Sequence, residues 1–287
     1  MRRLRRCASQ VTPWPVRATQ PIFSGHCQHG ADLIGTPEAS VFLQLALITL
    51  TAATLQGAAG FGFGLLALPG YLWALSSMEA VPLVVIVNLS ICTGLAAKLR
   101  RDVHLAVLRW MVAGALVGLP VGLFAFRRVG SDQLMLVVSA VVLICAVLLA
   151  RRKDAEAPRS GEGLPFRRGS AVGVGLVAGA MAVALGIPGP PVVLYLTSIA
   201  AAKDTLRATA LTFFAASYLA SLILQAAVVG IASGVWVTAA LLLPLAAAGG
   251  LVGNWLSHHV REDVFRRVTL VLIVVAGAST LVGVLLR

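Results

Sequence analysis

Two apolar stretches of the sequence contain clustered glycines, which can bring backbone N–H groups into contact with a ligand. The first runs LQGAAGFGFGLLALP over 55–69, and the second runs GIPGPPVVLYL over 186–196. Glycine and proline interrupt helices. A helix that restarts after such a break presents free N–H groups and about half a positive charge at its N-terminus. Because helix N-termini bind anions, the chemistry that these stretches could perform is the binding of a small anion.

Neutral polar residues occupy the same and neighbouring apolar segments. Gln56, Asn88 and Thr212 can donate hydrogen bonds, whereas no Asp or Glu lies at the centre of an apolar segment. Donors without carboxylates favour an anion over a cation site or a proton relay. We expect no catalytic residue, no metal site and no cofactor. The predicted substrate site comprises Gln56, Gly60, Gly62, Gly64, Asn88, Gly186, Gly189 and Thr212.

The composition places this site in a membrane. Hydrophobic residues make up 59% of the 287 residues and charged residues only 12%. Since about a quarter of a soluble domain is charged, the chain is predicted to be a polytopic membrane protein in a lipid bilayer. Its net charge of +12 is explained by basic cytoplasmic loops, so we expect no nucleic-acid partner.

Eight apolar segments follow one another, and a polar linker divides them four and four. The first segment of each half is overlong and broken by glycine or proline, at an offset of about 125 residues, which is typical of an internal repeat. The Arg-rich start of the chain reads as a disordered tail or as a start codon assigned too far upstream. The predicted organisation is a tail at 1–40, a first membrane repeat at 41–150, a cytoplasmic linker at 151–169 and a second membrane repeat at 170–287.

The overlong segments are predicted to form helical hairpins. Residues 39–78 contain no charge, and as one helix they would extend about 60 Å, twice the hydrocarbon core. If each broken segment returns to the side it entered, either as a re-entrant hairpin or as two short crossings, one side of the membrane receives fifteen Lys and Arg and the other three. A single crossing would give eleven against seven. The positive-inside rule favours hairpins, with the cytoplasmic loops at 98–109, 151–169, 203–207 and 258–267.

These predictions define an all-α membrane fold of two inverted repeats, each a broken helical hairpin followed by three transmembrane helices. Transporters of this design place their site near the midplane, where the breaks meet. The alternative is that the glycines only pack helices in the GxxxG manner, at Gly57, Gly60 and Gly64 and at Gly173 and Gly179. Replacing Gly173 or Gly179 with Ala is expected to be mild, because a regular helix favours Ala over Gly.

The sequence resembles the sulfite exporter TauE/SafE family of bacterial membrane permeases. GFGFGLLALPGYL followed by EAVPLVVIVNLS is similar to the family's first motif, and GIPGPPVVLYLTS followed by LRATALTFFAAS is similar to a proline-rich form of its second. The resemblance covers about 41–287. It implies transport of a small anion, often sulfite or an organosulfonate, across the bacterial cytoplasmic membrane.

A secondary transporter for a small anion is therefore the predicted function, and we expect no enzymatic activity. The alternative is an intramembrane enzyme acting on a lipid-linked substrate. Such an enzyme needs positioned acids, bases or metal ligands, whereas the acidic residues here are confined to loops. The substrate, the direction of transport, the coupling ion and assembly into a homo-oligomer stay open at this point.

Overall fold

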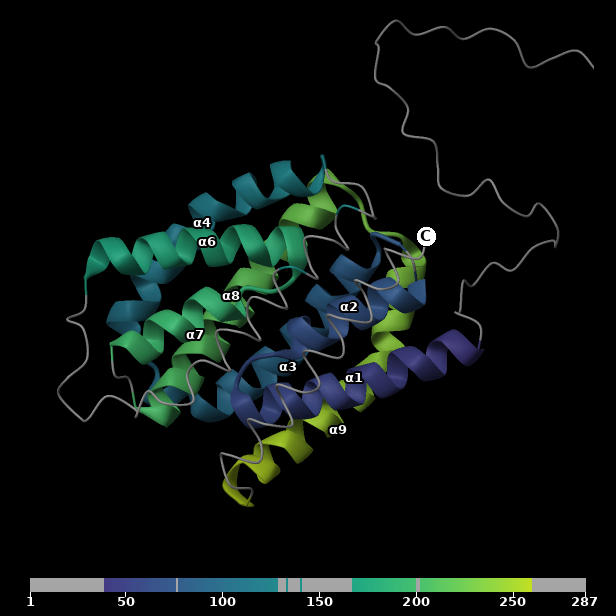
Figure 1. Ribbon diagram of the computed structural model, residues 1–287, viewed down its shortest axis with the longest axis horizontal. Helices are drawn as coiled ribbons and strands as arrows, with labels where there is room; N and C mark the ends of the chain where they lie inside the picture. Colours follow the sequence, from purple (N-terminus) through teal and green to yellow (C-terminus); the bar gives the residue numbers. More distant parts are fainter. Residues whose placement is uncertain are drawn as a thin grey trace, which may run out of the picture. The chain divides into compact units, whose positions relative to one another are not determined.

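The computed structural model describes residues 39–75, 77–128, 133, 140, 167–199 and 202–259 (Figure 1). This part of the chain contains helices and no strand. The helices are α1 (Ala39–Ala59), α2 (Phe63–Leu75), α3 (Ala80–Leu99), η1 (Arg100–Asp102, 3₁₀), α4 (Leu105–Phe126), α6 (Arg168–Leu185), α7 (Gly189–Ser198), α8 (Lys203–Val228) and α9 (Ser233–His259). Most of the predicted tail and linker, and nearly all of the apolar segments at 133–150 and 268–286, lie outside the described residues.

Six of these helices, α1, α3, α4, α6, α8 and α9, are long and apolar enough to cross a membrane. Large apolar side chains remain exposed on them, for example Leu43 on α1, Leu116 and Phe124 on α4 and Leu251 on α9. Exposed apolar side chains of this kind suit contact with lipid. The prediction of an all-α polytopic membrane protein is confirmed.

Both predicted helix breaks are present in the structure. Three residues separate α1 from α2, and three separate α6 from α7. The backbone has positive φ at Gly60 (+80°), Gly62 (+112°) and Gly186 (+64°), a region that side chains with a Cβ rarely adopt. After the first break, α2 runs back along α1: Thr49 and Tyr71 share a hydrogen bond of 2.6 Å between their hydroxyls. The first break therefore forms a helical hairpin.

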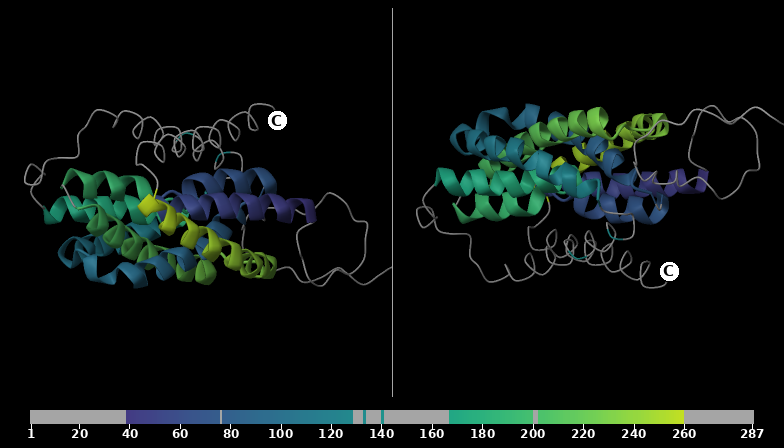
Figure 2. Two further views of the ribbon diagram at one scale, coloured as in Figure 1. Left: turned by 90° about the horizontal axis from the view of Figure 1, so that it is seen from below. Right: turned by 90° about the horizontal axis from the view of Figure 1, so that it is seen from above.

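The order long helix, break, short helix, long helix, long helix occurs twice along the described chain. Helices of one half pack on helices of the other: α1 on α9, α4 on α6 and α3 on α8 (Figure 1, Figure 2). In the α4–α6 pair, Gly114 faces Val172 and Gly122 faces Ala180, so the two helices run parallel. The α1–α9 pair is also parallel, because Gly249 faces Leu50 and Gly253 faces Thr54.

The third helices of the two halves, α3 and α8, run antiparallel. Asn88 in the middle of α3 bonds to Tyr218 of α8, while the backbone N–H of His104, beyond the end of α3, donates to Thr209 near the start of α8. The start of α3 correspondingly lies with the end of α8, where Glu79 and Val229 border one cavity. These directions assign each helix end to one of two ends of the bundle.

One of these, here called the basic end, combines the ends of α3 and α9 with the starts of α4, α6 and α8. Arg168 at the start of α6 lies over the ring of Trp110 of α4, at 5.5 Å from its centroid. The other end carries Glu79, Arg127 and Arg128 among its described residues. The described cations of the basic end are Lys98, Arg100, Arg101, Arg109, Arg167, Arg168, Lys203 and Arg207.

Small residues hold the two parallel pairs together. A Cβ at Gly114, Gly118 or Gly122 would overlap a carbonyl oxygen of α6, and one at Gly57 would overlap the carbonyl of Gly250 in α9. The GxxxG alternative therefore applies at the helix pairs. The expectation for Gly179 is wrong, because a Cβ there would lie 2.6 Å from the Cα of Ala115; Gly173 has no neighbour within 4 Å, so its expectation stays a prediction.

Candidate functional site

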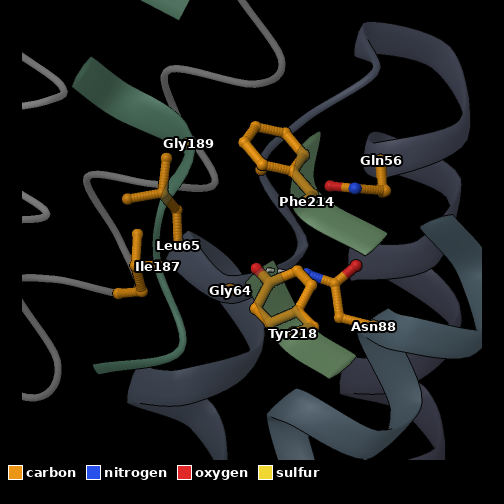
Figure 3. Close-up of a pocket in the computed structure, with 9 residues that line it drawn as sticks. Gln56, Gly64, Leu65, Asn88, Ile187, Gly189, Phe214 and Tyr218 are labelled. Atoms are coloured by element: carbon orange, nitrogen blue, oxygen red, sulfur yellow. Dashed lines mark hydrogen bonds between the residues drawn. The ribbon is translucent and has the colours of Figure 1, made fainter. Parts of the chain in front are cut away.

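The two breaks meet at a small cavity of about 10 Å³ inside the bundle (Figure 3). Residues of both halves surround it, from α1, α2, α3, α7 and α8 and from the breaks themselves. A cavity of this volume admits about one water molecule. Its lining consists of Gln56, Gly62, Gly64, Leu65, Asn88, Ile187, Gly189, Phe214 and Tyr218.

Most of the predicted site residues come together here. Gln56, Gly62, Gly64, Asn88 and Gly189 all border the cavity, although they come from positions up to 133 residues apart in the chain. The buried side chains of Gln56 and Asn88 are each 1% exposed. Packing of α3 against α8, and of the first break against the second, produces this arrangement.

Three predicted residues lie elsewhere. Gly60 packs beside Arg207, on the side of the first break away from the cavity lining. Gly186 ends α6 in the left-handed conformation, and its carbonyl accepts a hydrogen bond from Tyr218. The hydroxyl of Thr212 donates to the carbonyl of Ala208 at 2.8 Å within α8. Thr212 is therefore satisfied by its own helix, and none of the three lines the cavity.

The sequence prediction missed the aromatic residues of the cavity. Phe214 and Tyr218 are four residues apart on α8, so they occupy the same face of that helix and both point at the breaks (Figure 3). Each is 2% exposed. Their spacing, with Phe214 inside the motif LRATALTFFAAS and Tyr218 directly after it, is a sequence signal for this face. Choosing between this face and that of Thr212, however, requires the packing of α8 against both breaks.

A hydrogen-bond chain begins at the first break. The N–H of Phe63, in the first turn of α2, donates to the side-chain oxygen of Gln56 at 3.0 Å. The amide nitrogen of Gln56 donates to the sulfur of Cys92 at 3.2 Å, and the thiol of Cys92 donates to the amide oxygen of Asn88 at 3.5 Å. Gln56 thus satisfies one of the orphan N–H groups at the start of α2.

The chain continues from Asn88 to the second break. The amide nitrogen of Asn88 donates to the hydroxyl of Tyr218 at 2.8 Å (Figure 3). Tyr218 in turn donates to the carbonyl of Gly186 at 3.0 Å. This series of bonds connects the N-terminus of α2 to the C-terminus of α6. Because every link is buried, breaking one would leave a polar group unsatisfied, at a cost of about 1–3 kcal/mol.

The two breaks offer different numbers of N–H donors. At α2, Gly64 and Leu65 of the first turn border the cavity and retain their N–H groups. At α7, Pro190 and Pro191 follow Gly189, and proline has no N–H. Within the first three positions of α7, only Gly189 carries an N–H. Donors concentrate at α2.

Side chains of α8 donate hydrogen bonds to carbonyl groups at the C-terminal ends of α1 and α6, the helices that precede the two breaks. Ser221 donates to the carbonyl of Ala182 at 3.3 Å and Gln225 to that of Val183 at 3.0 Å, so neutral side chains cap the C-terminus of α6. At the first break a cation does so instead: the guanidinium of Arg207 donates to the carbonyl of Gly57 at 2.8 Å. By sequence Arg207 belongs with the basic loop residues, but the structure buries it inside α8.

A comparison with protein families agrees with this architecture. Neither a curated protein nor a solved structure matches the chain. The sequence profile of the sulfite exporter TauE/SafE family matches residues 45–280, a range that includes both breaks and every residue of the cavity. Since this match covers well over half of the chain, the protein belongs to the TauE/SafE sulfite exporter family, whose members are membrane transporters and not enzymes.

Proposed function

We propose that this protein is a permease that carries a small anion, such as sulfite or an organosulfonate, across the bacterial cytoplasmic membrane, and that the anion binds at the cavity between the two breaks. The observation that carries the proposal is the lining of this cavity. N–H groups of the first turn of α2 and the donors Asn88 and Tyr218 surround it, and none of the described residues in its lining carries a carboxylate. The enzyme alternative is set aside because the family consists of transporters.

The N-terminus of α2 supplies the electrostatic part of the site. Its aligned peptide dipoles place about half a positive charge next to Gly64 and Leu65, and the low dielectric of the bundle strengthens the attraction to an anion. Asn88 and Tyr218 add directional donors. Charge-assisted bonds to an anion are about twice as strong as neutral ones. An anion can therefore displace Gln56 as the acceptor of the Phe63 N–H and Gly186 as the acceptor of the Tyr218 hydroxyl.

Binding requires the breaks to separate, since a cavity of about 10 Å³ cannot hold an anion of several heavy atoms. The helix pairs suggest what moves. We infer that 41–150 and 170–287 are inverted repeats, because α1 and α6 start at opposite ends of the bundle and α3 runs antiparallel to α8. Rocking of α1–α2–α9 against α4–α6–α7 would open the cavity to either end in turn.

The basic end is proposed to face the cytoplasm, in accordance with the positive-inside rule. The loops at 98–109, 151–169, 203–207 and 258–267 would then share that side. Single cysteines introduced into 98–109 and near Arg127 test this with a membrane-impermeant thiol reagent in intact cells. Labelling of 98–109 from outside, with protection of the residues near Arg127, would reverse the orientation.

Transport itself is tested in proteoliposomes. The purified full chain is reconstituted, and uptake of radiolabelled sulfite, sulfoacetate, taurine and acetate is measured under imposed ion gradients. We expect saturable uptake of at least one anion, reduced about tenfold by Asn88→Ala, which removes a donor from the cavity and the hydrogen bond that the Tyr218 hydroxyl accepts. The variant Ser90→Ala serves as control, because Ser90 bonds only to Ile86 within α3. Uptake no greater than in protein-free liposomes for every anion would refute the proposal.

A further inference from the structure

Arg207 is a buried cation that forms an ion pair with none of the described residues, although the charge of the exposed Asp204, three residues earlier, attracts it. It lies in the second turn of α8, at the basic end, and only 4% of it is exposed. Among the buried side chains of the described residues it is the one that carries a charge. Withdrawing a guanidinium from water costs several kcal/mol unless a partner of opposite charge replaces the lost hydration.

Its hydrogen-bond partners are all neutral. One terminal nitrogen donates to the carbonyl of Gly57 at 2.8 Å and to the side-chain oxygen of Asn254 at 3.2 Å, and the other donates to the hydroxyl of Ser257 at 3.3 Å. The Nε–H is buried and has no hydrogen-bond partner among the described residues. No carboxylate in that part of the chain forms an ion pair with Arg207. An anion would supply both the missing acceptor and a negative charge bonded directly to the guanidinium.

Arg207 also lies directly behind the first break. Its Cγ is 3.0 Å from the position that a Cβ of Gly60 would occupy, while Gln56 and Gly62 border the cavity. The first break thus contacts the stem of Arg207 at Gly60 and borders the cavity two residues later, at Gly62. Along α8, Arg207 is seven residues from Phe214 and eleven from Tyr218, spacings that place all three on one face of the helix.

We propose that Arg207 is a second anion-binding residue of the permease, which receives the substrate at the basic end and controls its passage to the cavity. In this inference, which rests on the proposed function, the incoming anion replaces Asn254 and Ser257 as the acceptors of Arg207. That exchange releases α8 from α9. The first break then moves, and the anion passes to the N-terminus of α2.

Helix capping alone does not account for these contacts. A single bond to the carbonyl of Gly57 would satisfy the end of α1, and a neutral donor such as the Gln225 amide does this for α6 at a lower desolvation cost. The two roles predict different kinetics. A cap affects how much folded protein is present and hence the maximal rate, whereas an anion-binding residue affects the KM on its own side of the membrane.

The test measures KM for radiolabelled sulfite, or sulfoacetate if wild type transports only that anion, in vesicles of both orientations. Arg207→Gln is expected to raise the KM at the basic end about tenfold or more, because one charge-assisted interaction is lost, and to change the KM at the other end by less than about threefold. Arg207→Lys, which retains the charge, should raise it less. Arg109→Gln, an exposed arginine at the same end, is the matched control and should keep the wild-type KM.

Asn254→Ala and Ser257→Ala provide the sharper readout. Each removes a competing neutral acceptor, so the KM at the basic end should stay the same or fall, the opposite sign to Arg207→Gln. A wild-type KM in inserted Arg207→Gln, or a raised KM in both acceptor variants, would overturn the inference. If Arg207→Gln does not insert, Arg207→Lys and the acceptor variants decide it. Absence of flux in wild type would instead refute the proposed function, and this inference with it.

Discussion

The two breaks of this protein occupy equivalent places in the two halves but are built differently. The first, at 60–62, is flexible in composition: two of its three residues are glycines with positive φ, and the helix that follows keeps its N–H groups. The second, at 186–188, needs one such glycine and then three prolines within four residues. Proline fixes φ and removes donors, so the second break is stiffer and poorer in hydrogen-bond donors.

The side chains that cap the helix before each break also differ. A cation caps the helix before the first break, and neutral side chains cap the helix before the second. The cavity is therefore bordered by a break from each half, whereas the charged cap lies beside the first break. We infer that the first break holds the anion and the second supports it. Four predictions test this comparison, in order of expected effect.

The largest effect is expected at the point where the breaks touch. A Cβ at Gly64 would overlap the carbonyl of Gly186 and lie 3.2 Å from Ile187, so Gly64→Val should force the two breaks apart and abolish flux. Flux is measured per inserted molecule. Gly173→Val is the control, since that position is open. Near-normal flux in Gly64→Val would show that contact between the breaks is not needed.

The second prediction separates the two breaks directly. Gly62 has φ +112° and little space beside Leu55, so Gly62→Ala should reduce flux about tenfold or more. Gly189→Ala should reduce it less than about threefold, because Gly189 is helical and its nearest neighbours would be 3.8 Å away, an ordinary contact. Equal losses at the two positions would contradict the proposed asymmetry.

The third prediction concerns the link between the breaks. Tyr218→Phe removes the hydroxyl that connects Asn88 to Gly186, so the amide nitrogen of Asn88 and the carbonyl of Gly186 lose this partner, at a cost of about 1–3 kcal/mol. We expect flux to fall several-fold with insertion retained. Tyr195→Phe is a matched control, because none of the residues that the structure describes forms a hydrogen bond with the Tyr195 hydroxyl. Comparable losses in the two variants would assign the effect to general packing.

The smallest effect is expected at Thr212. Its hydroxyl bonds to Ala208 inside α8, and it does not line the cavity, so Thr212→Ala should leave the KM and the maximal rate within about twofold of wild type. The measurement is the same uptake assay with concentration series. A change in KM of about tenfold would mean that Thr212 contacts the anion during transport and that the cavity described here is only part of the site.

The sequence alone determined the membrane class, the positions of both breaks and most of the cavity. Few folds can accommodate uncharged segments that are far longer than a bilayer crossing and contain glycines. The reason is that backbone N–H and C=O groups without hydrogen-bond partners are excluded from lipid. Local rules of this kind identified Gln56, Gly62, Gly64, Asn88 and Gly189. The same rules placed the basic segments on one side of the membrane. The helix directions put the described basic residues of these segments at one end of the bundle.

Tertiary structure decided which face of each helix reaches the site. Periodicity places Thr212 and Tyr218 on one apolar helix, but only the crossing of α8 with both breaks directs Tyr218 to the cavity and Thr212 to its own backbone. The same crossing buries Arg207, a residue that its position among charged neighbours marks as a loop cation. Side-chain burial depends on contacts between segments 150 residues apart, such as Arg207 with Gly57, and a local sequence pattern carries no record of such contacts.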